Sequence, residues 1–133
     1  ASLRLWYVDH GGNSNINIYR MNINWNEAST WNSIGGGILP GINCDSASAL
    51  TVKPGNKAPA TLEIDVTAIV QGWINGNYAN YGFGFVNEKN NNMQFAASEN
   101  TTGTSAFTPK LIVKSQTAEW TFSNTNGSQG IVP

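Results

Sequence analysis

The sequence is poor in charge, in cysteine and in long apolar runs. Lys and Arg total 7 and Asp and Glu total 8, so charged residues make up 11% of the 133, against about 25% in ordinary domains. No stretch is strongly basic, which argues against nucleic-acid binding, because binding to phosphates requires clustered Lys and Arg. No apolar run approaches the ~20 residues of a membrane helix, and residue 1 begins no signal-peptide pattern. We therefore expect no nucleic-acid partner and no membrane insertion.

The sequence also lacks the usual signatures of metal sites and of catalysis. A lone cysteine, Cys44, cannot close an intrachain disulfide and has no neighbouring Cys or His for a zinc site. Asp9, Asp45 and Asp65 form no Asp-x-Asp-x-Asp-Gly calcium loop, and no Gly-x-Ser-x-Gly turn is present. We therefore predict no metal, no cofactor and no catalytic residue, and we expect a protein that is not an enzyme.

Uncharged polar and aromatic residues take the place of the missing charge. Asn occurs 19 times and Gly 14 times, with Trp 5, Tyr 4 and Phe 5. The length suits one domain with its own core. Low charge combined with abundant Asn, Thr and aromatic residues is typical of secreted bacterial β modules, so we expect an extracellular or cell-surface protein.

Apolar and polar residues alternate with a period of two along most of the chain. This pattern predicts strands at residues 2–8, 15–19, 49–52, 61–66, 81–86, 93–97 and 110–114. In the first of them, Leu3, Leu5 and Tyr7 share the inward face. Turn sequences rich in Gly, Asn and Pro separate the strands.

One segment has helical spacing, with four apolar residues on a stripe: Ile69, Val70, Trp73 and Ile74. Asp65 or Thr67 is available as the N-cap and Gly76 as the stop, which predicts a short helix at about residues 67–75. Many short strands and one minor helix predict an all-β fold, an antiparallel β-sandwich or jelly roll.

Several motifs, in order and spacing, resemble the DNRLRE-type modules. They are ASLRL at residues 1–5, WNEASTWN at 25–32, IDVT at 64–67, VQGW at 70–73, NYGF at 80–83, SE at 98–99 and PKL at 109–111. The resemblance implies a non-catalytic β-sandwich jelly roll in secreted, multi-domain bacterial and archaeal proteins. Some members of that family are carbohydrate-binding modules of polysaccharide-degrading enzymes, alginate being one substrate, and others lie in cell-surface proteins.

The chain departs from that family at both ends. Family domains usually carry strands before the ASLRL segment, whereas residues 116–133 extend beyond the usual end. Ala118, Trp120 and Phe122 alternate with polar residues, so the extension predicts one more amphipathic strand. We therefore predict a sandwich domain at residues 1–115 and a possible donor strand within 116–133. A donated strand would complete its own sheet, or would fill a neighbour's groove and build a head-to-tail filament.

Two functional hypotheses follow. The first is a structural subunit of a surface or extracellular filament that self-associates through Ala118, Trp120 and Phe122. The alternative is a carbohydrate-binding module of a secreted polysaccharide-degrading enzyme, with polysaccharide as the partner.

The candidate sugar-binding residues fall in two groups. Trp25 and Trp31 flank Glu27 and either offer aromatic platforms to a sugar ring or anchor their loop. Arg4, Trp6, Asn17 and Tyr19 lie on the outward faces of two strands that we expect to pair, where they form a ligand patch or a surface covered by protein.

Two Asn-x-Ser/Thr sequons, at Asn100 and Asn126, are candidate glycosylation sites.

Overall fold

The computed structural model describes residues 1–9, 15–54, 60–89, 93–97 and 108–123. Within them the chain forms two compact units, each built around one antiparallel sheet. In this part of the chain, no helix has the length and apolar character needed to cross a bilayer.

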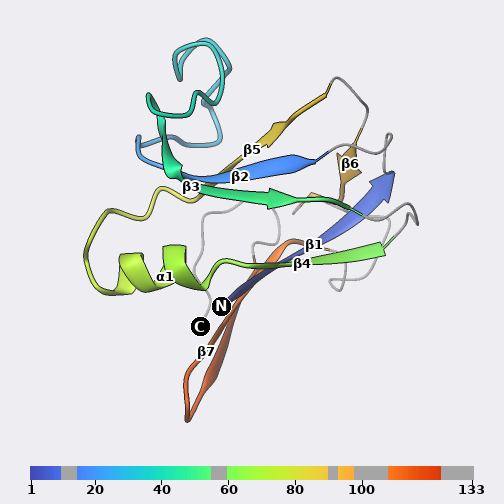
Figure 1. Ribbon diagram of the computed structural model, residues 1–133, viewed down its shortest axis with the longest axis vertical. Coiled ribbons are helices and arrows are strands. Elements are labelled where there is room, and N and C mark those ends of the chain that lie inside the picture. Colours follow the sequence, from blue (N-terminus) through green and yellow to red (C-terminus); the bar gives the residue numbers. More distant parts are fainter. Residues whose placement is uncertain (10–14, 55–59, 90–92, 98–107, 124–133) are drawn as a thin grey trace. The chain divides into compact units, whose positions relative to one another are not determined.

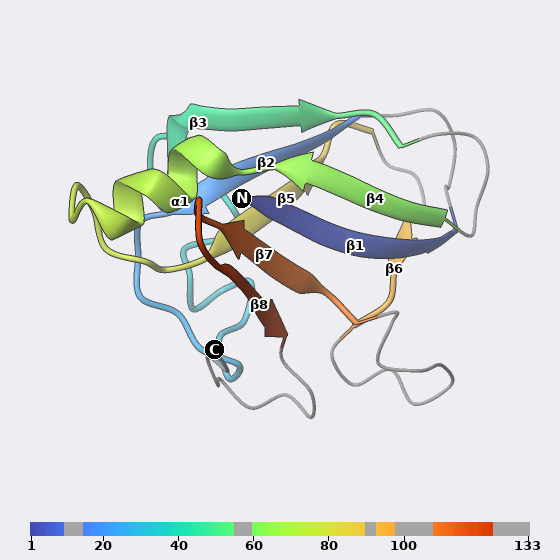
Figure 2. The same cartoon turned by 90° about the horizontal axis from the view of Figure 1, so that it is seen from below.

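The first unit contains a sheet whose strand order mixes the two ends of the chain. Figure 2 shows four strands side by side in the order β4 (Ala60–Asp65), β1 (Ser2–Asp9), β7 (Lys110–Lys114) and β8 (Glu119–Ser123). The short β6 (Gln94–Phe95) also pairs with β1. All pairings are antiparallel.

Alternation along β1 separates a buried face from a more exposed one. Leu3, Leu5 and Tyr7 are buried as predicted, together with Ile64 of the adjoining β4. Burial of such side chains is the main stabilising contribution to a sheet of this kind. Val8, on the opposite face of β1, is 48% exposed.

Strand β8 occupies the outer edge of this sheet. It follows β7 through a tight turn, in which the backbone N–H of Ser115 donates to the carbonyl of Ala118 at 2.7 Å. Trp120 lies opposite Val113 and Phe122 lies opposite Leu111. The predicted amphipathic strand in the extension is thus present, and it pairs with β7 of its own chain.

The second unit contains a three-stranded sheet and most of the helix. Figure 1 shows the central β2 (Ile16–Met21) between β3 (Cys44–Val52) and β5 (Phe83–Asn87). Ile16 and Ile18 are buried as predicted. A Cβ atom on Gly84 would lie 2.6 Å from Sδ of Met21, so a larger residue in β5 would require this side chain to shift.

The helix α1 (Thr67–Ile74) begins where predicted and ends one residue earlier. Asp65 accepts the backbone N–H of Thr67 at 3.0 Å, which satisfies a free donor at the helix start. Ile69 and Val70 are buried, but Ile74 is 65% exposed, so its place in the buried stripe was wrong. As the last helical residue before the Gly76 turn, it lies where the helix ends rather than where it packs.

The predicted fold class, an all-β antiparallel fold with one short helix, is confirmed. β7 has the predicted bounds, and β1, β2, β4 and β5 differ from theirs by one or two residues. β3 begins earlier than predicted, at Cys44, and β6 is shorter than predicted.

Candidate functional site

A cavity of about 360 Å³ opens in the loop that joins β2 to β3. Figure 1 shows this connection, drawn from blue to teal, curling into a compact loop at one end of its sheet. Ten described residues line the cavity: Met21, Trp25, Asn26, Glu27, Ser29, Thr30, Trp31, Ile34, Ile38 and Phe83. We call it the tryptophan cleft. Its volume lies at the lower end of the range of about 300–1,000 Å³ that small-ligand pockets occupy.

Two successive turns give the polar wall of the tryptophan cleft a fixed backbone. In the first turn, Ser29 Oγ accepts the N–H of Asn26, and Asn26 Oδ1 accepts the N–H of Ala28, both at 2.9 Å. In the second turn, Thr30 and Ser33 accept each other's backbone N–H at 3.2 and 2.8 Å. These side chains replace the hydrogen bonds that a regular element would supply.

A buried asparagine, Asn43, holds the far side of the loop. Its side chain is 2% exposed and makes three hydrogen bonds to loop backbone. Oδ1 accepts the N–H of Leu39 at 2.7 Å, and Nδ2 donates to the carbonyls of Ile34 at 2.9 Å and Gly37 at 2.7 Å. Because buried polar groups are costly unless paired, this amide determines the course of residues 34–39.

Trp31 rests on one of the loop glycines. A Cβ atom on Gly37 would lie 2.5 Å from Cη2 of Trp31, so only glycine allows the ring this close to the backbone. Gly37 also has φ of 113°, a conformation that favours glycine. The indole is nevertheless 70% exposed. The loop therefore supports the ring and leaves most of its surface to solvent.

Trp25 is anchored at its polar end. Its indole N–H donates to the carbonyl of Tyr81, and the side chain remains 38% exposed. Glu27, between the two tryptophans in sequence, is exposed and lines the same cavity. Each ring is therefore held by its loop and each is partly open. The interpretation of the tryptophans as platforms for a sugar ring stays a prediction.

The cation nearest to the cleft in sequence, Arg20, is already engaged. Its Nη2 lies 2.7 Å from Oδ2 of Asp45, and its guanidinium lies 3.7 Å above the ring centroid of Tyr78. The hydrogen bond from Arg20 lowers the pKa of Asp45, as does a further hydrogen bond from the backbone N–H of Ala47.

The lone cysteine is buried next to this ion pair. Burial, assisted by the charge of Asp45, raises the pKa of the Cys44 thiol. Cys44 is fully buried and belongs to the core.

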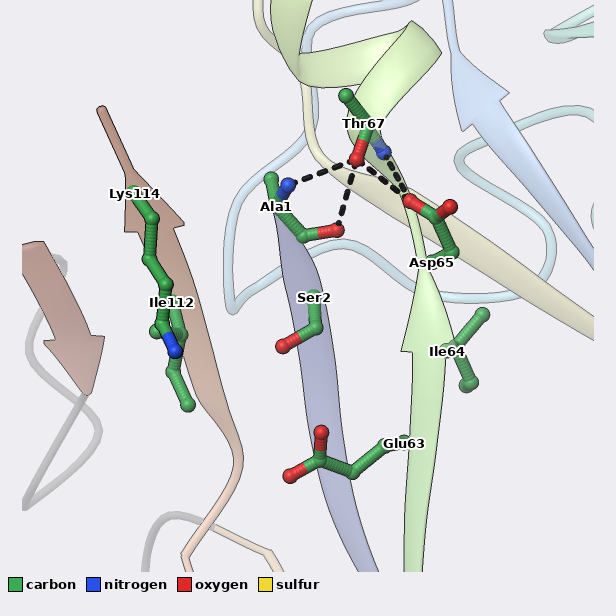
Figure 3. Close-up of a pocket in the computed structure, with 8 residues that line it drawn as sticks. All are labelled: Ala1, Ser2, Glu63, Ile64, Asp65, Thr67, Ile112 and Lys114. Atoms are coloured by element: carbon green, nitrogen blue, oxygen red, sulfur yellow. Dashed lines mark hydrogen bonds between the residues drawn. The ribbon is translucent and has the colours of Figure 1, made fainter. Parts of the chain in front are cut away.

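A second cavity, of about 430 Å³, lies in the first unit (Figure 3). Strand residues form most of its wall, among them Glu63, Asp65 and Lys114, and none of its described lining residues is aromatic. Asp65 is bonded to Thr67, as Figure 3 shows, and these hydrogen bonds lower the pKa of its carboxyl. Glu63 pairs with Arg4 and Lys114 pairs with Glu119. The charges that line this second cavity are thus largely compensated.

The predicted patch of Arg4, Trp6, Asn17 and Tyr19 does not form as one cross-strand surface. β1 pairs with β4, β6 and β7, while β2 pairs with β3 and β5, so the expectation that these two strands pair was wrong. Neighbouring strands in sequence pair only about two-thirds of the time.

The four residues of that patch have different surroundings. Arg4 is paired with Glu63, and Trp6 lies on the same face of β1, two residues further on. Asn17 accepts a hydrogen bond from Thr51 at 2.8 Å. Tyr19 is 9% exposed and packs with Met21 and Cys44 in the core of its unit.

Of the interface candidates, Ala118 lies in the turn before β8, Trp120 is 39% exposed and Phe122 is partly buried. The candidate sequons at Asn100 and Asn126 lie outside the described residues.

Sequence reasoning missed the two residues that support the loop, Asn43 and Gly37. Nothing in the sequence separates Asn43 from the other 18 asparagines, whereas the run Gly35–Gly36–Gly37 did indicate a turn.

Comparison with known proteins supports one of the two functional hypotheses. The family model for carbohydrate-binding module family 96 matches residues 1–115, which include every described element except β8. No curated protein and no solved structure matches the chain. The expected relation to carbohydrate-binding modules is confirmed, and the DNRLRE-type assignment stays a prediction. Since the match covers well over half of the 133 residues, the chain belongs to carbohydrate-binding module family 96.

Proposed function

We propose that this protein is a non-catalytic module that binds polysaccharide in the tryptophan cleft. The observation that carries the proposal is the presence of two partly exposed tryptophans, Trp25 and Trp31, on one cavity. The rest of its wall combines four apolar side chains with four polar ones, Asn26, Glu27, Ser29 and Thr30. Ligand pockets typically combine apolar and aromatic surface with a few placed polar groups. Family membership supports the same function.

The chemistry of a sugar ring matches this wall. A pyranose presents an apolar C–H face, which packs on an indole, and a rim of hydroxyl groups, which require hydrogen-bond partners. Trp31 offers the larger open surface, and Asn26, Ser29 and Thr30 offer amide and hydroxyl groups beside it. Because the supporting backbone is bonded within the loop, little ordering is needed on binding, which favours affinity.

The proposal extends to the setting of the protein. The polysaccharides that such modules bind lie outside cells. We therefore place the module in an extracellular or cell-surface protein, in line with the resemblance to DNRLRE-type modules. There it would keep a polysaccharide-degrading enzyme or a surface protein close to its polymer.

The test uses a matched pair of tryptophans. Trp25 and Trp120 are 38% and 39% exposed, but only Trp25 lines the cleft. In affinity gel electrophoresis against a panel of polysaccharides, we expect Trp25→Ala and Trp31→Ala to lose about tenfold or more in affinity, as expected when about 1.5–3 kcal/mol of apolar contact is removed. Trp120→Ala should bind like the parent chain. Equal losses for Trp25→Ala and Trp120→Ala, with circular dichroism unchanged, would refute the cleft as the site.

A second candidate function, a filament subunit that assembles through strand β8, stays a prediction. One observation favours it: β8 forms the outer edge of its sheet and carries a partly exposed tryptophan, and such edges are templates for further strands. Size-exclusion chromatography and negative-stain microscopy test it. Polymers that disappear in a Trp120→Ser, Phe122→Ser double variant would support assembly, whereas a monomeric parent chain would exclude it.

A further inference from the structure

We infer, resting on the proposed function, that the tryptophan cleft selects uncharged polysaccharides and discriminates against polyuronates and sulfated glycans. The ligand of this chain would then differ in charge from alginate, the polyuronate named above for some modules of the family that it resembles. The inference starts from the charge of the cleft. Of its lining residues that the structure describes, Glu27 is the one charged group, and none is Lys or Arg. Recognition of carboxylate or sulfate groups normally uses Arg or Lys donors.

Glu27 is available to act on a ligand. Its carboxylate is exposed, and no described residue forms an ion pair or side-chain hydrogen bond with it. An ionised carboxylate only accepts hydrogen bonds, so it suits the hydroxyl groups of a sugar and repels a second carboxylate at the same place.

The neutral groups of the cleft complement that acceptor. Asn26 Oδ1, Ser29 Oγ and Thr30 Oγ1 accept backbone N–H groups of the loop, as described above. These bonds use oxygen lone pairs and leave the amide and hydroxyl hydrogens to donate. The cleft therefore offers donors of no net charge together with one anionic acceptor, a combination that fits polyhydroxylic ligands.

The cations of the second unit do not offset Glu27. Arg20 is held by Asp45. Lys53 follows Val52, and Lys89 comes two residues after Asn87, and both of these strand residues pair with Ile16, at the opposite end of β2 from Met21. At about 3.3 Å per strand residue, the two lysines lie roughly 20 Å from the Met21 end. This separation is more than twice the screening length of about 8 Å at physiological salt.

The experiment compares uncharged and acidic probes on the intact chain. Affinity gels contain xylan, xyloglucan, galactomannan or laminarin on one side and alginate, polygalacturonate or dextran sulfate on the other, at low salt and with EDTA to remove bridging cations. We expect retardation by at least one uncharged polymer and at least tenfold weaker retardation by every acidic one. Raising the salt should leave the uncharged interaction unchanged.

Two matched charge variants locate the effect. Glu27→Gln should weaken binding of the uncharged polymer several-fold, because an amide oxygen accepts hydroxyl hydrogen bonds less strongly than a carboxylate, and should strengthen binding of acidic polymers several-fold. Glu88→Gln makes the same change of charge at the far end of the same sheet, where Glu88 accepts a hydrogen bond from Asn15, and it should alter neither. An equal gain in both variants would show that net charge alone acts, which would overturn the inference.

The two proposals fail in different ways. Tight binding of an acidic polymer that Trp31→Ala abolishes would overturn the neutral selectivity and retain the cleft as the site. If no polymer retards the parent chain, the proposed function itself fails, and the selectivity fails with it.

Discussion

The two cavities of this protein are lined by different kinds of structural element. The cavity of the first unit is formed mainly by strand residues, which alternate between core and surface. Its Glu63 and Lys114 are ion-paired, and its Asp65 is hydrogen-bonded to Thr67. The tryptophan cleft is formed mainly by a loop, which carries two large aromatic side chains without burying them. A strand buries its apolar residues against a core, whereas a loop with its own hydrogen bonds can hold apolar rings in solvent.

This contrast suggests that the ability to bind depends on the supports of the loop. Asn43 bonds to the backbone of residues 34, 37 and 39, and Gly37 contacts the ring of Trp31. Four experiments test or refine the comparison, from the largest expected effect to the smallest.

The largest effect is expected from Asn43→Ala. It leaves the N–H of Leu39 and the carbonyls of Ile34 and Gly37 without their partner, so we expect a loss of about 3 kcal/mol in the free energy of unfolding and loss of polysaccharide binding. Urea unfolding followed by circular dichroism measures the first effect and affinity electrophoresis the second. Asn75→Ala, which removes one exposed acceptor of Gln71, is the control and should cost about 0.5 kcal/mol or less. Similar losses in the two variants would contradict a special role for Asn43.

The next effect separates backbone strain from support of the ring. Gly36 and Gly37 have φ of 95° and 113°, so Gly36→Ala and Gly37→Ala should each cost about 1–2 kcal/mol in stability. A Cβ atom on Gly36 meets nothing within 4 Å, whereas one on Gly37 meets the ring of Trp31. We therefore expect only Gly37→Ala to weaken polysaccharide binding about tenfold, measured at matched fractions of folded protein. Equal affinity in the two variants would argue against the Gly37 contact as the support of Trp31.

A smaller effect is expected from pH. Asp45 in the second unit and Asp65 in the first have pKa values below their ordinary value of 3.8, mainly because Arg20 and Thr67 donate to them. The folded protein binds these protons less tightly than the unfolded chain does. The stabilisation is therefore complete above the ordinary pKa and is lost as the pH falls through the lowered values.

Substitution should expose that dependence separately for each unit. Asp45→Asn should cost at most about 1 kcal/mol at neutral pH, since a partly exposed pair is screened, and should reduce the fall in stability below about pH 4. Asp65→Asn should act in the same direction. Urea unfolding between about pH 2 and pH 7 provides the measurement. Variants as acid-sensitive as the parent chain would show that other carboxylates dominate.

The smallest effect is expected at the surface of the first unit. Arg4 is a predicted ligand residue, but its guanidinium pairs with Glu63, and the two side chains are 41% and 48% exposed. Arg4→Gln should change the stability by about 0.5 kcal/mol or less and leave polysaccharide affinity unchanged. A loss of affinity as large as that of Trp31→Ala would move the binding site to this sheet.

Local patterns predicted the elements well because each rests on neighbouring residues. Alternation located β1, with Leu3, Leu5 and Tyr7 inward, and β7 within its observed bounds. The helix began as predicted because Asp65 supplies an N-cap within the same short segment. Prediction failed where the pattern was weak, as in the small residues at the start of β3, and at Ile74, where helical spacing continued although the packing did not.

The candidate site was predicted only in part. Trp25 and Trp31 were identified because a tryptophan in a loop can offer an aromatic platform to a sugar ring, and the structure places both on one cavity. The patch that joined Arg4 and Trp6 to Asn17 and Tyr19 depended on which strands pair, and that prediction was wrong. A strand's pattern shows which of its sides is apolar but does not identify its partner.

The sequence by itself therefore determined the class of the fold, the places of most strands and the residue types of the loop that carries Trp25 and Trp31, because periodicity and turn chemistry act over a few neighbouring residues. Only the tertiary structure decided that β1 pairs with β4 and β7, that Asn43 bonds across the loop, and that Gly37 lies beneath Trp31. Each of these depends on the path of the backbone in space, where residues distant in sequence meet, and a burial pattern along the chain carries no information on which of them do.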